Sequence, residues 1–308
     1  MIAILLASYN GEQFIAEQIK SLLAQTVQDF KIYINDDKST DATWKIVSDF
    51  AKENPDKIVI YQNEVNSGAA EHNFINMMIK CKDDYIMLCD QDDVWLPNKI
   101  ELTFSKMKTM EAEFGKDTPL LVHTDLTVVD ENLEIVSPSF KAAMNANYGK
   151  MKLRNQIIQN TLTGCTVMYN KALASLITDI PQYMVMHDWW LMLCAAAFGK
   201  IAALDEQTIL YRQHRKNEVG AKDVRTLSYK FKRFFNYSEI KTALNITYMQ
   251  AQSFYTMFEG KLSDSQKKLL TAYCDIPNHN KFVRAYKIWH LGTLKNGFSR
   301  RVAQFMFI

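Results

Sequence analysis

The first 90 residues alternate between two hydrophobic periods, and this alternation restricts the possible folds more than any other feature of the chain. Continuous apolar runs, typical of strands buried on both faces, occupy residues 2–8, 30–35, 57–62 and 85–89. Apolar residues at helical spacing occupy the intervening segments, residues 15–23, 41–54 and 69–81. Strands and helices in strict alternation predict a parallel sheet with helices on its faces, so we expect an α/β fold.

Polar residues stand at the carboxyl end of each predicted strand. They are Ser8-Tyr9-Asn10-Gly11, Asp36-Asp37, Asn66-Ser67-Gly68 and Asp90-Gln91-Asp92-Asp93, in chain order. Ligands of open parallel sheets bind in the crevice beyond these strand ends. We therefore expect the functional site at this edge of the sheet.

The glycines exclude the common nucleotide-binding fingerprints. No two of the ten glycines stand two apart, so GxGxxG is absent, and the pair five apart, Gly292 and Gly297, is followed by Phe298 instead of the P-loop lysine.

Carboxylates at the sheet edge indicate instead that a phosphate is held through a metal ion. Asp90 and Asp92 suit a hard cation that keeps positions for water and phosphate oxygens. The alternative is that these acidic residues only cap the next helix.

Several segments together resemble one known family. They are LLASYNGEQFIAEQIKSLLAQT, INDDKSTDAT, DQDDVWLPNKIE, HDWWLMLCAAAFGKIAALDE and ILYRQH, in this order over roughly residues 1–215. With them the chain resembles the inverting glycosyltransferases of family 2, which have the GT-A fold. Within that family it is most similar to bacterial rhamnosyltransferases that build cell-wall and capsular polysaccharides.

The resemblance implies a donor site at the sheet edge. Residues that would line the nucleotide pocket are Ala7, Tyr9 and Asn10 around the base and ribose, Asp37 on the base imide N–H, and Asn66 and Gly68 close to the nucleotide. Asp37 could instead be a turn or helix-cap residue, as could its neighbour Asp36. Gly68 could be an ordinary turn glycine.

The resemblance also implies a metal site. Asp90 and Asp92 match the family's DXD-type motif, in which the second carboxylate binds Mg²⁺ or Mn²⁺ and the first contacts the ribose or the waters of the metal, so both are candidate metal ligands. His214 would be a third metal ligand, and Arg212 would hold the diphosphate with its charged fork. Both could instead be surface residues that follow a strand at 208–211. Asp93 is expected to cap a helix that begins near residues 96–97.

Asp188 falls where the family places its general base, which takes the proton of the acceptor hydroxyl. It is also a natural N-cap for the apolar helix predicted over 189–198. His187 would orient the base or contact the acceptor, although a packing role is common for a single histidine. Further acceptor-side candidates, each with ordinary packing as the alternative, are Trp95, Trp189 and Gly164, the last in a strand predicted from Thr163 to Met168.

Charge divides the chain in two. Residues 225–308 hold 14 basic and 4 acidic side chains, although the whole chain carries only +2. Aromatic residues interleave with the cations, for example in Tyr229-Lys230-Phe231-Lys232-Arg233-Phe234-Phe235, as a membrane-surface helix requires. A helical dimer interface is the alternative, and no nucleic-acid recognition motif accompanies the charge.

Five scattered cysteines without CxxC fit a reducing compartment, and no apolar run reaches the roughly 18 residues of a membrane span.

These observations lead to one expected organisation. Residues 1–220 should form a GT-A catalytic domain, with residues 1–95 binding the nucleotide and 96–220 the acceptor, and residues 221–308 a basic helical extension. The expected activity is metal-dependent, inverting transfer of L-rhamnose from dTDP-L-rhamnose to a lipid-linked glycan, in the cytoplasm at the inner face of the membrane. The alternatives are a UDP-hexose or UDP-N-acetylhexosamine donor, and a non-catalytic scaffold that binds sugar nucleotides. A nucleotidyltransferase should carry a glycine-rich basic loop near its N-terminus, which is absent here.

Overall fold

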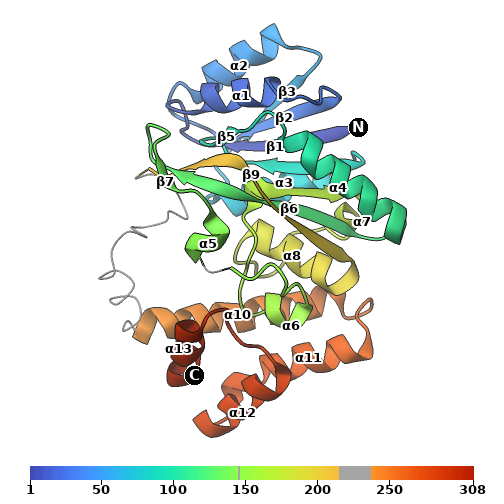
Figure 1. Ribbon diagram of the computed structural model, residues 1–308, viewed down its shortest axis with the longest axis vertical. Helices are drawn as coiled ribbons and strands as arrows, with labels where there is room; N and C mark the ends of the chain where they lie inside the picture. The colour runs from blue at the N-terminus through green and yellow to red at the C-terminus, as the bar shows by residue number, and fades with distance from the viewer. Residues whose placement is uncertain (145, 215–236) are drawn as a thin grey trace. The chain divides into compact units, whose positions relative to one another are not determined.

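The computed structural model describes residues 1–144, 146–214 and 237–308, which form two compact units (Figure 1). The first unit contains residues 1–141, 162–180 and 198–214, and the second contains 142–161, 181–197 and 237–308. Two segments expected within the first 220 residues, 142–161 and 181–197, fall in the second unit, and the boundary expected at residue 220 lies outside the described residues. The basic segment 229–235 lies outside the described residues.

The first unit is built on a nine-stranded mixed sheet of order β3-β2-β1-β4-β8-β6-β9-β5, with β7 paired to β6. Its strands are β1 Ile2–Ser8, β2 Phe30–Asp36, β3 Ile58–Gln62, β4 Tyr85–Cys89, β5 Val94–Trp95, β6 Leu120–Val129, β7 Ile135–Ser137, β8 Val167–Asn170 and β9 Lys200–Arg212. Strands β1 to β4 are parallel, as predicted, whereas β8 runs antiparallel to both β4 and β6. The α/β fold class is confirmed.

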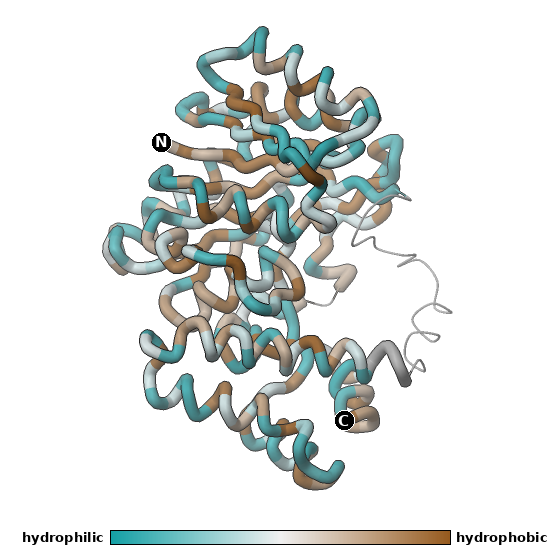
Figure 2. The backbone as a smooth tube through the Cα atoms, turned by 180° about the vertical axis from the view of Figure 1, so that it is seen from behind, coloured by the Kyte–Doolittle hydropathy of each residue, from teal (hydrophilic) through white to brown (hydrophobic). Residues whose placement is uncertain are grey.

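Helices cover this sheet because their apolar residues recur on one side. The helices of the unit are α1 Ile15–Leu23, α2 Thr43–Glu53, α3 Ala70–Lys80, α4 Lys99–Phe114 and α7 Lys171–Ala174. Helix α1 buries Ile15, Ile19 and Leu22, which lie one and two turns apart. Figure 2 shows the same partition, with hydrophobic strands and mostly hydrophilic connections. Each fully buried aliphatic side chain of this core contributes about 1.5–3 kcal/mol to stability.

Helices make up most of the second unit. They are α6 Leu153–Gln156, α8 His187–Phe198, α10 Tyr237–Phe258, α11 Asp264–Cys274, α12 Lys281–Leu291 and α13 Phe298–Phe307, while the short α5, Phe140–Met144, spans the boundary between the units. Trp190 of α8 is fully buried, with its ring 5.3 Å from that of Phe254 and 6.2 Å from that of Phe258. The predicted C-terminal helical extension is confirmed. None of the described helices combines the length and apolar composition needed to cross a bilayer.

Three local predictions are corrected by the structure. Residues Gly164–Thr166 form a 3-10 turn before β8, because both the amide and the hydroxyl of Thr166 donate to the Thr163 carbonyl oxygen, at 3.0 and 2.7 Å. Asp93 caps no helix, since α4 begins at Lys99 after Asn98. Asp188 is not an N-cap but stands in the first turn of α8.

Candidate active site

The two carboxylates at the end of β2 have different surroundings. Asp36 is fully buried and accepts hydrogen bonds from Ser8 Oγ, from the Ser39 amide and hydroxyl, and from Gln62 Nε2, at 2.5–3.2 Å. These donors come from β1, from the loop after β2 and from β3. Asp36 therefore fixes the sheet edge and offers nothing to a ligand.

Asp37 lies next to the predicted base pocket and is 4% exposed. Its Oδ1 accepts from Asn63 Nδ2 at 2.6 Å and from the Ser67 amide at 2.8 Å, and its Oδ2 accepts from Ser67 Oγ at 2.7 Å. A carboxylate has about four acceptor positions, so one remains for the base imide. That contact stays a prediction, and the carboxylate already orders the segment that follows β3.

The Asn66–Gly68 turn explains why glycine stands at residue 68. Gly68 has φ +87°, and its amide donates to Asn66 Oδ1 at 2.8 Å. The left-handed conformation favours glycine over any residue with a Cβ. Asn66 Nδ2 also donates to the carbonyl oxygen of Asp37, at 2.9 Å. The turn thus lies beside Asp37, and its contact with the nucleotide remains a prediction.

The loop after β1 is joined to the loop after β4 by one side chain. Gln91 Oε1 accepts from the Tyr9 amide and Gln91 Nε2 donates to the Tyr9 carbonyl oxygen, both at 2.9 Å. Gly11 makes room for this amide, because an added Cβ would lie 2.5 Å from Gln91 Cδ. The Tyr9 ring is 47% exposed at this edge, whereas Ala7 is buried in β1. We refer to the two Gln91–Tyr9 hydrogen bonds as the Gln91 clamp.

Asn10, also predicted near the nucleotide, holds the next turn. It has φ +47°, a left-handed conformation that Asn tolerates better than most residues. Its amide donates to Ser39 Oγ at 2.9 Å, and its Oδ1 accepts from the Thr40 amide at 2.8 Å. The loops after β1 and β2 are therefore bound to each other at the predicted pocket.

Asp92 and His214 meet at the same edge although they are far apart in sequence. His214 Nε2 lies 2.8 Å from Asp92 Oδ2, and the two side chains are 10% and 15% exposed. The imidazole packs against Phe14, with ring centroids 4.8 Å apart. The two predicted metal ligands thus lie within hydrogen-bond distance of each other, and their binding of a metal stays a prediction.

Asp90 and Asp93 lie close to a third group behind this pair. Ligand atoms of Asp90, Asp93 and Cys165 all lie within 4.8 Å of one another. Asp93 is fully buried, and its Oδ1 accepts from the Arg212 amide at 3.1 Å. Burial, and then the negative charges of Asp92 and Asp90, raise the pKa of Asp93 well above its ordinary value. Burial likewise raises the pKa of the Cys165 thiol.

The acidic side chains after β4 suit a divalent cation. Asp90, Asp92 and Asp93 stand within four positions, and burial, followed by the charges of Asp92 and Asp90, raises the pKa of Asp93, a cost that a cation would relieve. Buried Asp93 Oδ2 has no hydrogen-bond partner among the described residues. Cys165 is protonated and therefore a poor ligand. Among the described residues, the ligand atoms that lie together are those of Asp90, Asp93 and Cys165, and Asp92 with His214 forms a separate pair. Two carboxylates and an imidazole would suit Mg²⁺ or Mn²⁺, so Asp90, Asp92 and His214 stay the predicted ligand set.

Arg212 is turned toward the protein. Its side chain is 3% exposed, donates to the carbonyl oxygens of Asp92 at 2.8 Å and Glu131 at 2.6 Å, and forms an ion pair with Glu17. Its guanidinium also stacks on Phe14, 4.5 Å from the ring centroid. Arg212 therefore holds the backbone of the carboxylate motif, and its predicted contact with the diphosphate remains a prediction.

Lys99 lies in the core beneath the carboxylate motif. Its side chain is fully buried, its Nζ lies 4.6 Å from the Trp95 ring centroid, and it forms no hydrogen bond with the described residues. Burial lowers its pKa to about 8. Trp95 is 2% exposed, so the structure places it in the core and not on an acceptor surface.

The predicted general base belongs to the second unit and is described within it. Asp188 is 8% exposed, and its Oδ1 lies 2.6 Å from the Trp189 amide in the first turn of α8. A carboxylate there is stabilised in its ionised form by the helix dipole. His187 beside it is buried, which lowers its pKa to about 3 and keeps it neutral. Trp189 is buried and donates to the Gln156 carbonyl oxygen at 2.6 Å, a packing role.

Sequence reasoning missed Gln91, Phe14, Glu17 and Lys99 as parts of this site. Gln91 stands between two predicted site residues, and its position was the available signal. The other three lie on faces of helices, or near their ends, that look like ordinary core or solvent positions. Gly164 lies buried in the turn before β8, and its predicted place on the acceptor side stays a prediction.

Comparison with known proteins gives a consistent result. The family model described as "Glycosyl transferase family 2" matches residues 3–173. The dTDP-rhamnosyl transferase RfbG of Shigella flexneri is 30% identical over 230 residues, covering 70% of this chain and 74% of that protein. The UDP-Glc:alpha-D-GlcNAc-diphosphoundecaprenol beta-1,3-glucosyltransferase WfaP of Escherichia coli is 30% identical over 151 residues, covering 49% of this chain and 55% of that protein.

Two solved structures share the fold. Residues 1–349 of TarS from S. aureus, in complex with UDP-GlcNAc, have a TM-score of 0.58 at 17% identity, covering 89% of this chain and 71% of that chain. The mannosyltransferase PcManGT from Pyrobaculum calidifontis, in complex with GDP-Man and Mn²⁺, has a TM-score of 0.54 at 11% identity, covering 94% of this chain and 72% of that chain. At these identities the likeness concerns the fold alone, and it confirms the expected GT-A fold.

Proposed function

The chain belongs to glycosyl transferase family 2, and from this premise we propose that it is a metal-dependent, inverting transferase that moves L-rhamnose from dTDP-L-rhamnose onto a growing surface polysaccharide. The choice of rhamnose is supported by the Shigella relative, whose name gives dTDP-rhamnose as its donor. A UDP-hexose is the second candidate, since the Escherichia coli relative is named as a glucosyltransferase that uses UDP-Glc.

One observation carries the proposal. Asp92 and His214 lie 2.8 Å apart at the sheet edge where β1, β2 and β4 end, and Asp90 and Asp93 stand in the same loop after β4. Ligands of open parallel sheets bind at this edge, and a carboxylate and imidazole set suits a cation that holds phosphate oxygens. Asp90, Asp92 and His214 would hold Mg²⁺ or Mn²⁺. Such an ion, when bound, neutralises charge on the departing diphosphate.

The reaction we propose is a single displacement. Asp188 takes the proton from the acceptor hydroxyl while that oxygen attacks the anomeric carbon. The bond between the anomeric carbon and the diphosphate oxygen breaks on the opposite face, which inverts the anomeric centre. Asp37 orients the donor by accepting the base imide N–H, and the Gln91 clamp holds the Tyr9 loop against the base. The role requires an ionised carboxylate, and the position of Asp188 in the first turn of α8 favours that form.

We also propose that the acceptor is a lipid-linked glycan and that the enzyme works at the inner face of the membrane. The Escherichia coli relative is named for a diphosphoundecaprenol acceptor, which supports this choice. The excess of cations in residues 225–308 supports contact with an anionic surface.

Release of nucleotide diphosphate by the purified chain tests the proposal. The donors are dTDP-rhamnose, UDP-glucose, UDP-galactose and UDP-N-acetylglucosamine, each with Mg²⁺, Mn²⁺ or EDTA and with a membrane lipid extract as acceptor source. We expect release from dTDP-rhamnose only, abolished by EDTA, Asp92→Asn and Asp188→Asn. Asp205→Asn, which changes an exposed carboxylate elsewhere in the first unit, is the matched control and should keep activity. Release from a UDP-sugar would reassign the donor, and release unaffected by EDTA would overturn the metal.

A further inference from the structure

Helix α12 exposes a stripe of aromatic side chains. Phe282, Tyr286 and Trp289 follow one another at spacings of four and three, and they are 87%, 59% and 66% exposed. This spacing places them on one side of the helix, whereas Ile288 is buried. Three large exposed rings on one helix face exceed what a soluble surface needs, and they mark a contact surface.

A basic pocket lies beside this stripe and includes one of its rings. Lys150, Lys152 and Arg154 line a cavity of about 530 Å³ together with Trp289 and His290. The chain turns at Gly292, which ends α12 with φ +69°, a conformation that favours glycine. The Arg154 side chain lies 3.6 Å from where a Cβ of residue 292 would stand, which is ordinary contact distance, so this cation lies beside the end of the aromatic helix.

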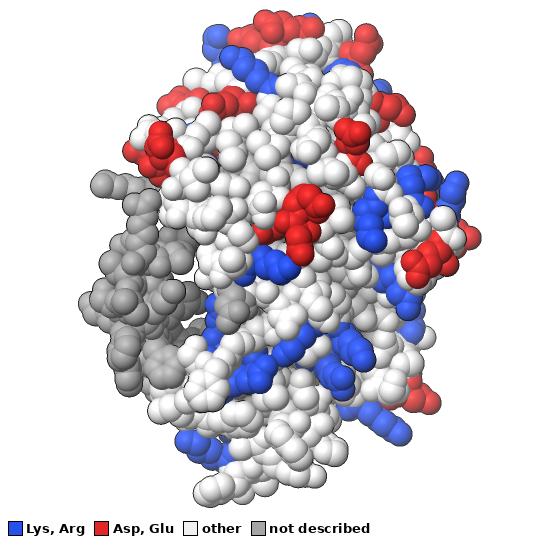
Figure 3. Space-filling view, viewed as in Figure 1, with Lys and Arg blue, Asp and Glu red and all other residues white. Residues whose placement is uncertain are grey.

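The described residues do not neutralise the charge of this pocket. Within residues 1–144, 146–214 and 237–308, none of Lys150, Lys152 and Arg154 forms an ion pair with a carboxylate. On α12 itself Lys287 is paired with Asp275 at 2.5 Å. Figure 3 shows Lys and Arg side chains gathered over α6 and the helices around it, with Asp and Glu only at the margin. The pocket thus presents a net positive charge to an anionic group.

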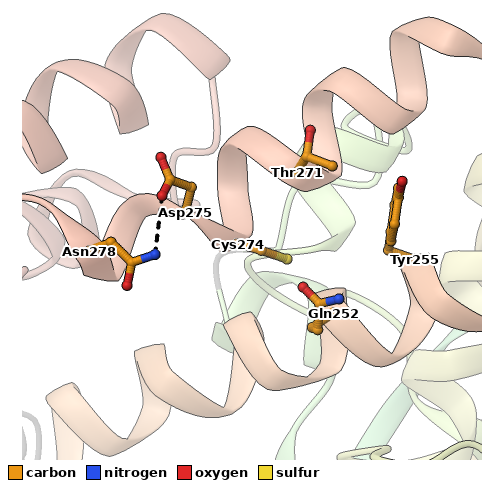
Figure 4. A pocket seen from close by; sticks show the side chains of 6 residues that line it. All are labelled: Gln252, Tyr255, Thr271, Cys274, Asp275 and Asn278. Carbon is orange, nitrogen blue, oxygen red and sulfur yellow. Dashed lines mark hydrogen bonds between the residues drawn. The ribbon is translucent and has the colours of Figure 1, made fainter.

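A second cavity in the same unit is lined by one acidic side chain, Asp275, and by no basic one. It measures about 260 Å³ and lies between α10 and α11, where Tyr255, Cys274 and Asp275 are among its lining residues (Figure 4). Asp275 accepts hydrogen bonds from Lys287, His279 and Asn278, and Lys287 and then His279 hold the pKa of its carboxyl well below the usual range. The charge of Asp275 is neutralised by Lys287 and His279, so this cavity, unlike the basic pocket, needs no outside partner.

We infer that Lys150, Lys152, Arg154, Phe282, Tyr286 and Trp289, here called the basic-aromatic surface, bind an anionic phospholipid bilayer. Lipid phosphates pair with the three cations, and the rings enter the interface between headgroups and acyl chains. Charge complementarity selects this occupant over a second copy of the chain, whose same surface would bring like charges together. The inference rests on the proposed membrane location and names the surface responsible. That surface includes residues 150–154, which precede the basic C-terminal region.

Sedimentation with vesicles tests this inference on the full chain. The vesicles contain phosphatidylcholine alone or with about one-third phosphatidylglycerol. We expect binding only to the anionic vesicles, weakened by salt. Each cation at such a surface contributes about fivefold (~1 kcal/mol), so Lys150→Gln, Lys152→Gln and Arg154→Gln together should weaken binding roughly 100-fold. Phe282→Ser with Trp289→Ser should weaken binding at least tenfold.

Matched variants separate the surface from general charge and hydrophobicity. Lys261→Gln, Lys267→Gln and Lys268→Gln remove the same charge around α11, and Val65→Ser with Ile135→Ser removes side chains that are 78% and 66% exposed elsewhere. Both controls should bind vesicles within about twofold of the wild type. Circular dichroism of every variant shows that it is folded.

Several outcomes would overturn the inference. The first is an equal loss of vesicle binding in the test and control variants. The second is displacement of the protein from vesicles by millimolar inorganic pyrophosphate, which would indicate a free phosphate ligand. The third is a dimer that the aromatic variant dissociates without any loss of vesicle binding. Wild-type protein that releases nucleotide but ignores anionic vesicles refutes only this inference. Vesicle binding without release from any donor refutes the proposed function and leaves the surface in place.

Discussion

Replacing Gly11 by alanine should break the Gln91 clamp without touching Gln91. An alanine Cβ at residue 11 would lie 2.5 Å from Gln91 Cδ and closer still to its Oε1, so the amide has to leave. Gly11 is not among the glycines with positive φ, so alanine fits the backbone itself. The direct effect of Gly11→Ala is therefore confined to the space that the side-chain amide of Gln91 occupies.

The structure sets the size of the effect. Each of the two hydrogen bonds between Gln91 and Tyr9 contributes roughly 1 kcal/mol, so losing both costs about 2 kcal/mol. Gln91→Ala removes the same two bonds. Because either change alone abolishes the clamp, the double variant should also lose about 2 kcal/mol, and not about 4 kcal/mol. The coupling between the two sites is then about 2 kcal/mol.

Urea unfolding of the four proteins, followed by far-ultraviolet circular dichroism, measures this cycle. Gly260→Ala is the control, because an added Cβ there meets nothing within 4 Å. It should change stability by less than about 1 kcal/mol. The reasoning fails if the Gly11 and Gln91 losses add to within about 0.5 kcal/mol, or if Gly11→Ala alone is neutral.

Three further predictions concern the first unit. Arg212→Lys should lose roughly 2–3 kcal/mol of stability in unfolding and should weaken Mn²⁺ binding in calorimetry. One ammonium cannot reach the Asp92 carbonyl, the Glu131 carbonyl and the Glu17 carboxylate together. Unchanged Mn²⁺ affinity would show that Arg212 does not hold the carboxylate motif. Burial lowers the pKa of His123 to about 4, so between about pH 6.5 and 4 the unfolded chain alone takes up the proton. The free energy of unfolding should then fall by roughly 3 kcal/mol as pH drops through that window, and His123→Gln should flatten the slope of stability against pH; an unchanged slope contradicts this. Gly199→Ala should destabilise by about 1–3 kcal/mol in thermal unfolding, since its Cβ would overlap the Pro119 carbonyl oxygen; a neutral result would show that β6 and β9 separate freely.

The parallel half of the sheet could be predicted because its signal is local. Each of the four strands is an apolar run, and each helix between them repeats its apolar residues every three or four positions. The short strands could not be predicted in this way. β5 has two residues, Val94 and Trp95, and exists because β9 hydrogen-bonds to it from Ile209 and Leu210.

The site was predictable in its residue types and less so in its contacts. Asp92 and His214 were paired from the family pattern, and they do meet. Arg212 was expected to face the phosphate, and it donates to the protein, because acceptors far away in sequence surround it. The position of Gln91 between Asp90 and Asp92 was a signal, but its contact could not be predicted, since its partner is the backbone of Tyr9 and any residue could supply that backbone.

The strand order has a consequence for the synthesis of the chain. The carboxylate motif ends in β5, whose ladder partner is β9, and Asp92 contacts His214, which follows it by 122 residues. At roughly 5–20 residues per second, a ribosome needs about 6–25 s to deliver that partner after it has made the motif. Throughout that interval the nascent chain carries three aspartates with neither His214 nor Arg212 beside them. The contact between Asp92 and His214 is therefore completed late in translation, so a ribosome that stalls before residue 200 leaves a chain that has the strands of the parallel half but lacks this contact.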